Sequence, residues 1–172
     1  MAAKNKGTRY WLFKTEPDVY SIDDLAKEKT CYWEGIRNYQ ARNSLRDDAK
    51  PGDQVLIYHS NAKTKEGKPA IGLVGIAEVC KAGYPDHTAL DPKSKYYDPK
   101  SKFDNPTWYM VDVKFVRKLK RLISLQELKS NPALENMLVV QQGSRLSIQP
   151  VQETEWQSVL QMEKTPLNEE LK

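Results

Sequence analysis

The sequence predicts an α+β fold in which a small mixed β-barrel is surrounded by short helices. Three segments rich in apolar and β-branched residues, at 53–60, 71–79 and 108–116, predict the strands. Pairs of helix-capping residues lie outside these segments and predict short helices. The chain has 172 residues, the usual size of one domain that buries a core without disulfides or metals.

The first strand is expected at 10–14, where YWLFK is followed by Glu16-Pro17, because proline cannot donate to a ladder. The segment 53–60 is almost continuously apolar and predicts a buried strand. Two glycines in 71–79 suit a sharply coiled barrel, where backbones approach closely. The alternation in 108–116 is typical of a half-buried antiparallel strand.

Three capping boxes predict the helices. Ser21 with Asp24 precedes a short helix near IDDLAKE, and Ser124 with Glu127 precedes a second one. A third pair, Thr154 with Gln157, predicts the start of a C-terminal helix.

The domain is expected to cover residues 9–162, between a disordered leader over 1–8 and a flexible tail over 163–172. No apolar run approaches the roughly 20 residues that span a bilayer, and no hydrophobic segment resembles a signal peptide. We therefore expect an intracellular protein without a membrane partner, cytoplasmic or nuclear, and favour a monomer.

Charge and motif content restrict the function classes. The formal net charge of +4 permits nucleic-acid binding without requiring it. Cys31 and Cys80 lack CxxC spacing, and with two histidines in the chain we expect neither a metal site nor a disulfide framework. Neither a P-loop nor a GxGxxG motif occurs, so no cofactor is expected.

The most unusual segment is 31–46, CYWEGIRNYQARNSLR, which contains few core-forming residues. Its composition fits a surface that stacks on bases and contacts phosphates. It fits equally a solvated helix over a buried tryptophan, with Asn38 as the N-cap. The candidate binding residues in this segment are Trp33, Arg37, Asn38, Tyr39 and Arg42. The basic run 117–121 has two explanations as well, a solvated strand end or a phosphate-contacting patch.

His59 and Ser60 end a predicted strand, where small barrels commonly place binding groups. A small hydrolase that uses Cys31 or Ser60 with His59 is the enzymatic alternative, but no nucleophile signature supports it. A second alternative is a protein-interaction module that docks through the tyrosine-rich segment 84–106, which is too long for a structureless loop without a function or packing.

Six motifs occur in order between residues 9 and 162: YWLFKTEP, WEGIRNYQARN, YHSN, GYPDH, NPTWYMVDV and RLSIQPV. Together they closely resemble the EVE domain family. The resemblance implies a PUA-like fold, related to the YTH domains that bind methylated adenine, and it implies binding without catalysis. The expected partner is RNA or modified DNA, with one base held in an aromatic pocket.

The resemblance also implies roles for individual residues. Trp33 is expected to form a wall of the base pocket, with Asn38 and Tyr39 at its rim. The remaining expected contacts are Lys14 and Ser60 from the strands, and Arg145 and Ser147 from the opposite side.

Overall fold

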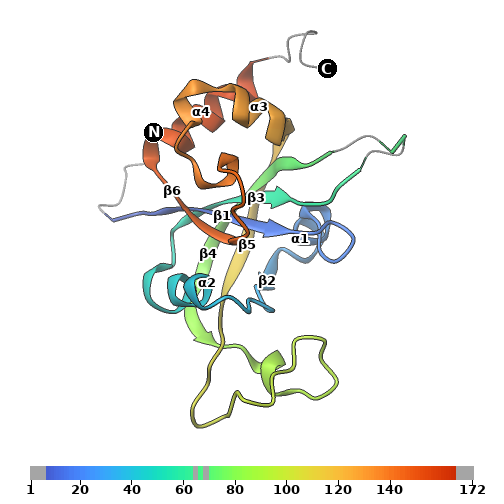
Figure 1. Cartoon of the computed structure of the whole chain (residues 1–172), viewed down its shortest axis with the longest axis vertical. Helices are drawn as coiled ribbons and strands as arrows, with labels where there is room; N and C mark the ends of the chain where they lie inside the picture. The colour runs from blue at the N-terminus through green and yellow to red at the C-terminus, as the bar shows by residue number, and fades with distance from the viewer. Residues whose placement is uncertain (1–6, 64–65, 68–69, 166–172) are drawn as a thin grey trace.

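The computed structural model describes residues 7–63, 66–67 and 70–165, which form a mixed sheet with short helices around it (Figure 1). The strands are β1 (Tyr10–Thr15), β2 (Thr30–Tyr32), β3 (Gln54–His59), β4 (Gly72–Pro85), β5 (Tyr109–Ser124) and β6 (Ile148–Val151). Their order in the sheet is β2-β5-β4-β3-β1-β6, with β1 and β3 parallel and the other neighbours antiparallel. The α+β class is confirmed.

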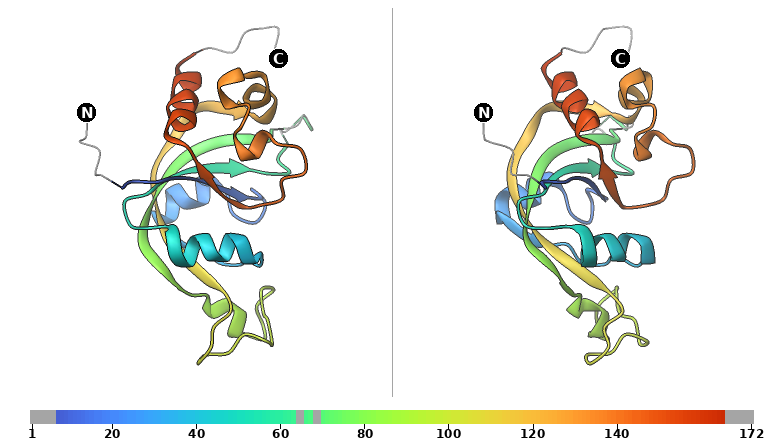
Figure 2. Two further views of the ribbon diagram at one scale, coloured as in Figure 1. Left: turned by 60° about the vertical axis from the view of Figure 1, so that its left-hand side comes forward. Right: turned by 90° about the vertical axis from the view of Figure 1, so that its left-hand side faces the viewer.

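The sheet is curved but open, whereas the sequence led us to expect a barrel. In the described part of the chain, no ladder joins the edge strands β2 and β6, which have three and four residues. The long strands β4 and β5 shift register several times along their ladder and bend around the other strands (Figure 2). Both also extend beyond the expected segments, to Pro85 and Ser124.

The helices are α1 (Ile22–Glu28), α2 (Tyr39–Asn43), α3 (Leu125–Ser130) and α4 (Glu153–Lys164). A π-helical turn, Ser44–Asp48, continues α2, and the 3-10 turns are His87–Leu90, Pro132–Leu134 and Leu138–Val140. The capping boxes expected before α1 and α3 are confirmed. The third was wrong: α4 begins two residues earlier than expected, and Glu155 accepts from the backbone N–H of Gln152 at 2.8 Å.

Both faces of the central strands are buried. In β1, Trp11 and Phe13 belong to one core cluster and Leu12 to the other. The helices α3 and α4 cover the second face, with Leu128 and Trp156 in its core (Figure 2). Burial on both sides explains why 53–60 is almost continuously apolar.

The basic run 117–121 lies in β5, where its arginines join the sheet to the helices. Arg117 makes a bidentate ion pair with Glu163 of α4, at 2.5 and 2.9 Å. Arg121 pairs with Glu127 of α3 and donates to the carbonyl of Met162. These arginines are therefore structural.

The helical structure continues past residue 162, where the sequence led us to expect the end of the domain. The helix α4 continues to Lys164, and Glu163 is buried where it pairs with β5. Of the expected leader, residues 1–6 lie outside the described residues, as do residues 166–172 of the tail.

The carboxylate of Asp53 fixes the start of β3 against β1. It is buried and accepts hydrogen bonds from the indole N–H of Trp11 at 2.9 Å and from the backbone N–H groups of Arg9 and Lys50. Removal of a buried acceptor leaves its donors unpaired, which is destabilising.

We therefore predict that Asp53→Ala lowers the free energy of unfolding by about 1 to 3 kcal/mol, because three donors lose their acceptor. Denaturant titration measures the change. The exposed Asp104→Ala is the matched control and leaves stability unchanged. Equal stabilities of the two variants would contradict the role of Asp53.

Candidate functional site

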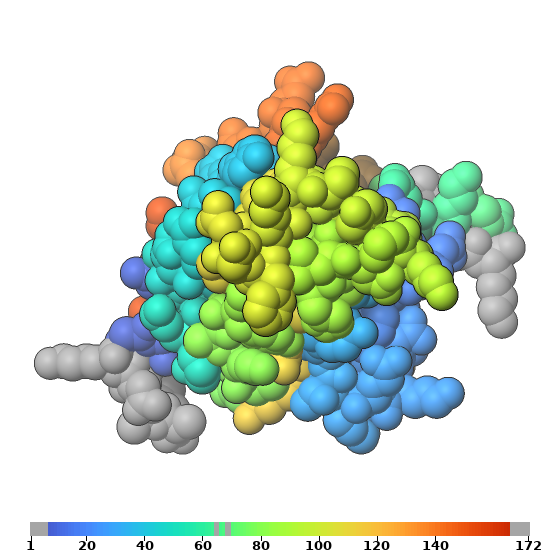
Figure 3. Space-filling view, turned by 90° about the horizontal axis from the view of Figure 1, so that it is seen from below, coloured from blue at the N-terminus to red at the C-terminus, as the bar shows by residue number. Residues whose placement is uncertain are grey.

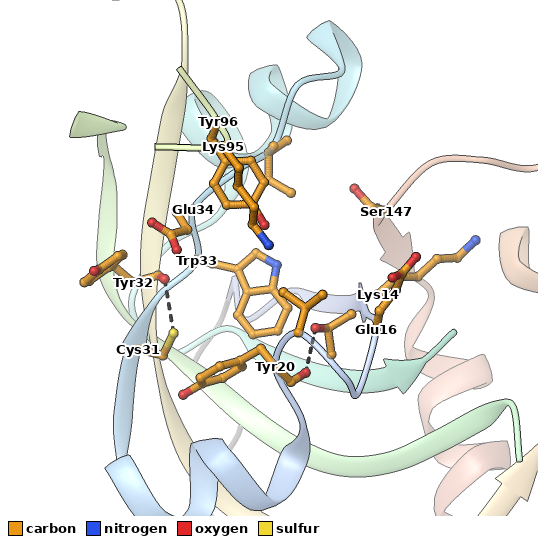
Figure 4. Close-up of a pocket in the computed structure, with 14 residues that line it drawn as sticks. Lys14, Glu16, Tyr20, Cys31, Tyr32, Trp33, Glu34, Lys95, Tyr96 and Ser147 are labelled. Atoms are coloured by element: carbon orange, nitrogen blue, oxygen red, sulfur yellow. Dashed lines mark hydrogen bonds between the residues drawn. The ribbon is translucent and has the colours of Figure 1, made fainter. Parts of the chain in front are cut away.

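A pocket of about 600 Å³ lies around the side chain of Trp33 (Figure 4). This volume is in the range of small-molecule sites. Its walls come from the end of β1 and the following turn, from the segment after β2, from the loop between β4 and β5, and from the residue before β6. The lining residues used below are Lys14, Tyr20, Cys31, Trp33, Glu34, Gly35, Lys95, Tyr96 and Ser147.

Trp33 forms the floor of the pocket and belongs to the core at the same time. Its side chain packs against Phe13, with ring centroids 5.5 Å apart, and against the edge of Tyr20 at 6.2 Å. The residue is 7% exposed, and its backbone N–H donates to Val111 of β5 at 2.8 Å. In Figure 4 the indole nitrogen faces the open side of the pocket, and among the described residues it has no hydrogen-bond acceptor.

Tyr96 forms the wall above Trp33, and Arg37 holds it there. The guanidinium of Arg37 donates to the carbonyl oxygen of Tyr96 from Nε at 3.1 Å and Nη2 at 2.6 Å. Gly35 makes the close approach possible, because a Cβ at this position would lie 2.6 Å from the Tyr96 ring. Its φ of 82° also favours glycine.

Asp86 connects this wall to the segment after β2. Its carboxylate accepts from Arg37 Nη1 at 2.9 Å, from the backbone N–H of Gly35 at 3.0 Å, and from the backbone and hydroxyl of Thr88. Burial of this carboxylate acts to raise the pKa of Asp86, but the hydrogen bonds from Thr88, Gly35 and Arg37 outweigh burial and hold the pKa below its ordinary value.

The pocket is lined by hydrogen-bond donors and by a hydrogen-bond acceptor. Glu34 presents a carboxylate beside Trp33 (Figure 4), and its pKa is raised by burial and by the negative charge of Asp86. Lys14 donates to the carbonyl of Ser144 at 3.3 Å, and burial lowers its pKa. The hydroxyl of Ser147 has no partner among the residues that the structure describes. An acceptor and several donors thus surround one aromatic floor.

The structure brings together three of the residues expected at the site, Lys14, Trp33 and Ser147. Arg37 lies behind the wall, with its guanidinium engaged as described above. Arg145 is exposed and does not line the pocket.

Asn38, Tyr39 and Arg42 do not line the pocket. Asn38 is the N-cap of α2, and its side chain accepts from Ala41 at 3.0 Å. Tyr39 is 61% exposed and stacks on Trp108 at 5.0 Å. Arg42 donates to the carbonyl of Thr107 at 2.7 Å and lies over the Tyr39 ring. These side chains fasten α2 to the loop that precedes β5.

His59 and Ser60 lie outside the pocket lining. The Nε2 atom of His59 accepts from the backbone N–H of Ile22 at 3.0 Å, and the hydroxyl of Ser60 donates to the carbonyl of Thr15 at 3.4 Å. Burial raises the pKa of the Cys31 thiol to about 11, the opposite of what an activated nucleophile needs. In the described ranges, no three potential metal ligands form a cluster. The geometry gives the hydrolase alternative no support.

Glu34 and Tyr96 were not among the residues expected at the site. Glu34 lies between the tryptophan and the glycine of the WEGIRNY motif. The motif could therefore have indicated Glu34 as a site residue. Tyr96 belongs to the segment 84–106, for which the sequence indicated a function without showing where the segment folds.

The sequence profile of the EVE domain matches residues 9–162. The chain belongs to the EVE domain family. Human thymocyte nuclear protein 1 is 43% identical over 90% of this chain and 73% of its own length. A hypothetical protein from Leishmania major superposes with a TM-score of 0.84 at 46% identity, covering 94% of this chain and 98% of that one.

Human THYN1 protein has been solved in complex with DNA that contains 5-methylcytosine. It superposes on this chain with a TM-score of 0.84 at 42% identity, covering 93% of this chain and 100% of the human one. The EVE domain is a binding domain, and its fold is PUA-like. None of the helices in the described part of the chain is long and apolar enough to cross a membrane.

We predict that Asp86→Asn lowers the free energy of unfolding by about 1 to 3 kcal/mol at pH 7, because an amide cannot accept all the hydrogen bonds that the carboxylate accepts. The folded pKa of Asp86 is depressed, so its stabilisation is complete above the unfolded value of about 3.9 and is lost as pH falls through the folded pKa. Denaturant titrations at neutral and acidic pH measure the effect.

The variant should therefore lose less stability on acidification than the wild type does. Asp104→Asn, at an exposed position, is the control and keeps the wild-type pH dependence. An unchanged acid sensitivity in Asp86→Asn would rule out this linkage.

Proposed function

We propose that this protein binds DNA without catalysis and holds a 5-methylcytosine base in the pocket above Trp33. The single observation that carries the proposal is the pocket itself, an aromatic floor surrounded by hydrogen-bonding groups. The complex of human THYN1 protein with DNA containing 5-methylcytosine supports the choice of ligand.

The aromatic side chains would contact the base, with the N–H edge of the Trp33 indole turned toward it and Tyr96 beside it. Both are held before any ligand arrives, Trp33 by the core and Tyr96 by Arg37, so binding would need little side-chain ordering. Burial of one methyl group contributes about 0.8 kcal/mol, which gives roughly fourfold discrimination against cytosine. A larger preference requires a rigid wall that the methyl group completes.

The polar groups would recognise the edge of the base. The carboxylate of Glu34 is an acceptor for an exocyclic amino group such as N4 of cytosine. The indole N–H of Trp33 and the hydroxyl of Ser147 are available to donate to the ring acceptors. Thymine and uracil present a carbonyl in place of the amino group and would leave Glu34 unpaired.

A base inside duplex DNA must rotate out of the stack to enter such a pocket, which costs a few kcal/mol. The same pocket chemistry would accept a single-stranded ligand without this cost, so RNA carrying a methylated base remains an alternative ligand to be tested alongside DNA. The name of thymocyte nuclear protein 1 supports a nuclear location for this chain.

We predict at least fourfold tighter binding of oligonucleotides that contain 5-methylcytosine than of matched cytosine oligonucleotides, at one fixed salt concentration. Fluorescence anisotropy measures both affinities, and N6-methyladenine against adenine is measured in parallel. Equal affinities within both pairs would reject a modified-base site and leave a general nucleic-acid binder.

Two variants test the residues. We predict that Glu34→Ala weakens binding of 5-methylcytosine oligonucleotides by roughly tenfold, because a charge-assisted hydrogen bond to the amino group is lost. Trp33→Phe keeps an aromatic ring in the core but removes the indole N–H, and it should weaken binding several-fold without unfolding the protein. Truncation of Trp33 to alanine is unsuitable, since a buried tryptophan contributes about 3 to 5 kcal/mol to stability.

Glu135→Ala is the matched control, because Glu135 is exposed at the opposite end of the molecule, between α3 and α4. It should bind as the wild type does. Wild-type affinity in Glu34→Ala would remove Glu34 from the proposed recognition of the base.

A further inference from the structure

The loop between β4 and β5 exposes an aromatic side chain that the pocket does not use. Phe103 is 89% exposed, the highest value among the exposed large hydrophobic residues of the described chain. Tyr97, in the same loop, is 42% exposed. Single exposed apolar side chains are common on protein surfaces, so the inference depends on how the turn and the lysines of the loop present this ring.

Phe103 occupies a turn with defined geometry. The backbone N–H of Asn105 donates to the carbonyl of Lys102 at 3.1 Å and closes the turn around Phe103. Beneath it, Ser101 is buried and its hydroxyl accepts from Thr107 at 3.1 Å. The turn therefore presents the ring to solvent without the entropy cost of ordering a flexible segment.

The base of the loop is also fixed. Asp98 accepts from the indole N–H of Trp108 at 2.7 Å, and its backbone N–H donates to the carbonyl of Ala89 at 2.9 Å. Trp108 in turn lies against Arg37 and stacks on Tyr39. The loop that carries Phe103 is therefore connected through Trp108 to Arg37, which positions the pocket wall.

Three exposed lysines of the loop 91–106 carry unpaired positive charge. Among the described residues, Lys93, Lys100 and Lys102 have no carboxylate partner. The nearby aspartates are engaged in the loop itself: Asp91 accepts from the backbone N–H of Lys93, and Asp98 from that of Lys100. An exposed ring among free lysines matches a polyanion with stacked bases better than it matches an apolar protein surface.

The loop is continuous with the pocket. Lys95 and Tyr96 line the pocket, and Phe103 follows seven residues after Tyr96 on the same loop. Seen from below, this loop covers the end of the molecule between the segment 31–48 and the turn before α1 (Figure 3). A strand with one base in the pocket could leave across this face, because Lys95 and Tyr96 of the loop line the pocket.

We propose that the loop 91–106 is a second nucleic-acid contact, in which Phe103 stacks on a nucleotide that flanks the base in the pocket and Lys93, Lys100 and Lys102 contact its phosphates. The inference rests on the proposed function, because it assumes that nucleic acid is the ligand. It adds that affinity comes from flanking nucleotides as well as from the recognised base.

The test is Phe103→Ala, assayed with single-stranded oligonucleotides that carry one 5-methylcytosine or one cytosine at the same position. Loss of base stacking lowers the affinity for both by roughly 5- to 150-fold, equivalent to about 1 to 3 kcal/mol. The ratio of the two affinities, which reports on the pocket, stays at the wild-type value. Phe103 is exposed, so thermal stability is expected to be unchanged.

Three variants serve as controls. Phe103→Trp retains the affinity because it can stack, whereas Phe103→Leu loses it, which separates stacking from a general apolar contact. Val116→Ala, at an exposed apolar position of β5 outside the loop, binds as the wild type does.

The outcomes distinguish the two proposals. If the wild type prefers 5-methylcytosine and Phe103→Ala retains full affinity, the loop contact is wrong and the pocket proposal stands. If the wild type shows no preference while Phe103→Ala still loses affinity, the pocket proposal fails and the loop contact stands. Retention of affinity in Phe103→Leu would indicate an apolar partner such as a protein and would overturn the stacking contact.

The lysines are tested by salt dependence. Replacement of Lys93, Lys100 and Lys102 by glutamine should reduce the slope of log affinity against log salt concentration by roughly 2, at about 0.7 per phosphate contact of a single strand. Oligonucleotide titrations across a series of salt concentrations measure the slope. An unchanged slope would exclude these lysines as phosphate contacts.

Discussion

The candidate site depends on one buried carboxylate, that of Asp86. It binds Gly35 and Arg37 from the segment after β2 and Thr88 from the loop after β4, so it joins two parts of the chain about fifty residues apart. Arg37 then extends this connection to Tyr96. Without the connection from Asp86 through Arg37, these hydrogen bonds would no longer hold Tyr96 above Trp33. A buried charge is stable here because nearly every oxygen lone pair that it presents has a donor.

This constraint explains why most of the arginines in the unusual segment are not available to phosphates. Arg37 holds the wall and Arg42 holds the loop before β5, each through a backbone carbonyl and a nearby aromatic ring. At the opposite end, Arg117 and Arg121 join β5 to α4 and α3. Among the described residues, Lys93, Lys100 and Lys102 have no carboxylate partner, and lysines suit phosphate contacts made as point charges. A basic composition therefore says little about binding until the ion pairs are known.

Sequence patterns predicted four of the six strands and two of the three expected helix starts, because apolar alternation and capping boxes are local features. The short edge strands β2 and β6 were not predicted. Trp33 was predicted from its motif to form a wall of a base pocket; in the structure it forms the floor of the pocket, and its contact with a base stays a prediction. Glu34 and Tyr96 were missed, since nothing local shows that residue 96 folds back over residue 33. His59 and Ser60 were expected near the ligand because they end a predicted strand, whereas in the structure both side chains bind backbone groups and neither lines the pocket.

By itself the sequence determined the fold class, the positions of the main strands and the family, since each depends on residue types at short and fixed spacings. Only the tertiary structure decided that the sheet stays open, that the side chain of Asn38 caps α2 and does not line the pocket, and that Asp86 unites the pocket walls. These facts depend on contacts between residues far apart in the chain. The strength of these contacts depends on burial, and burial is a property of the packed molecule rather than of any segment.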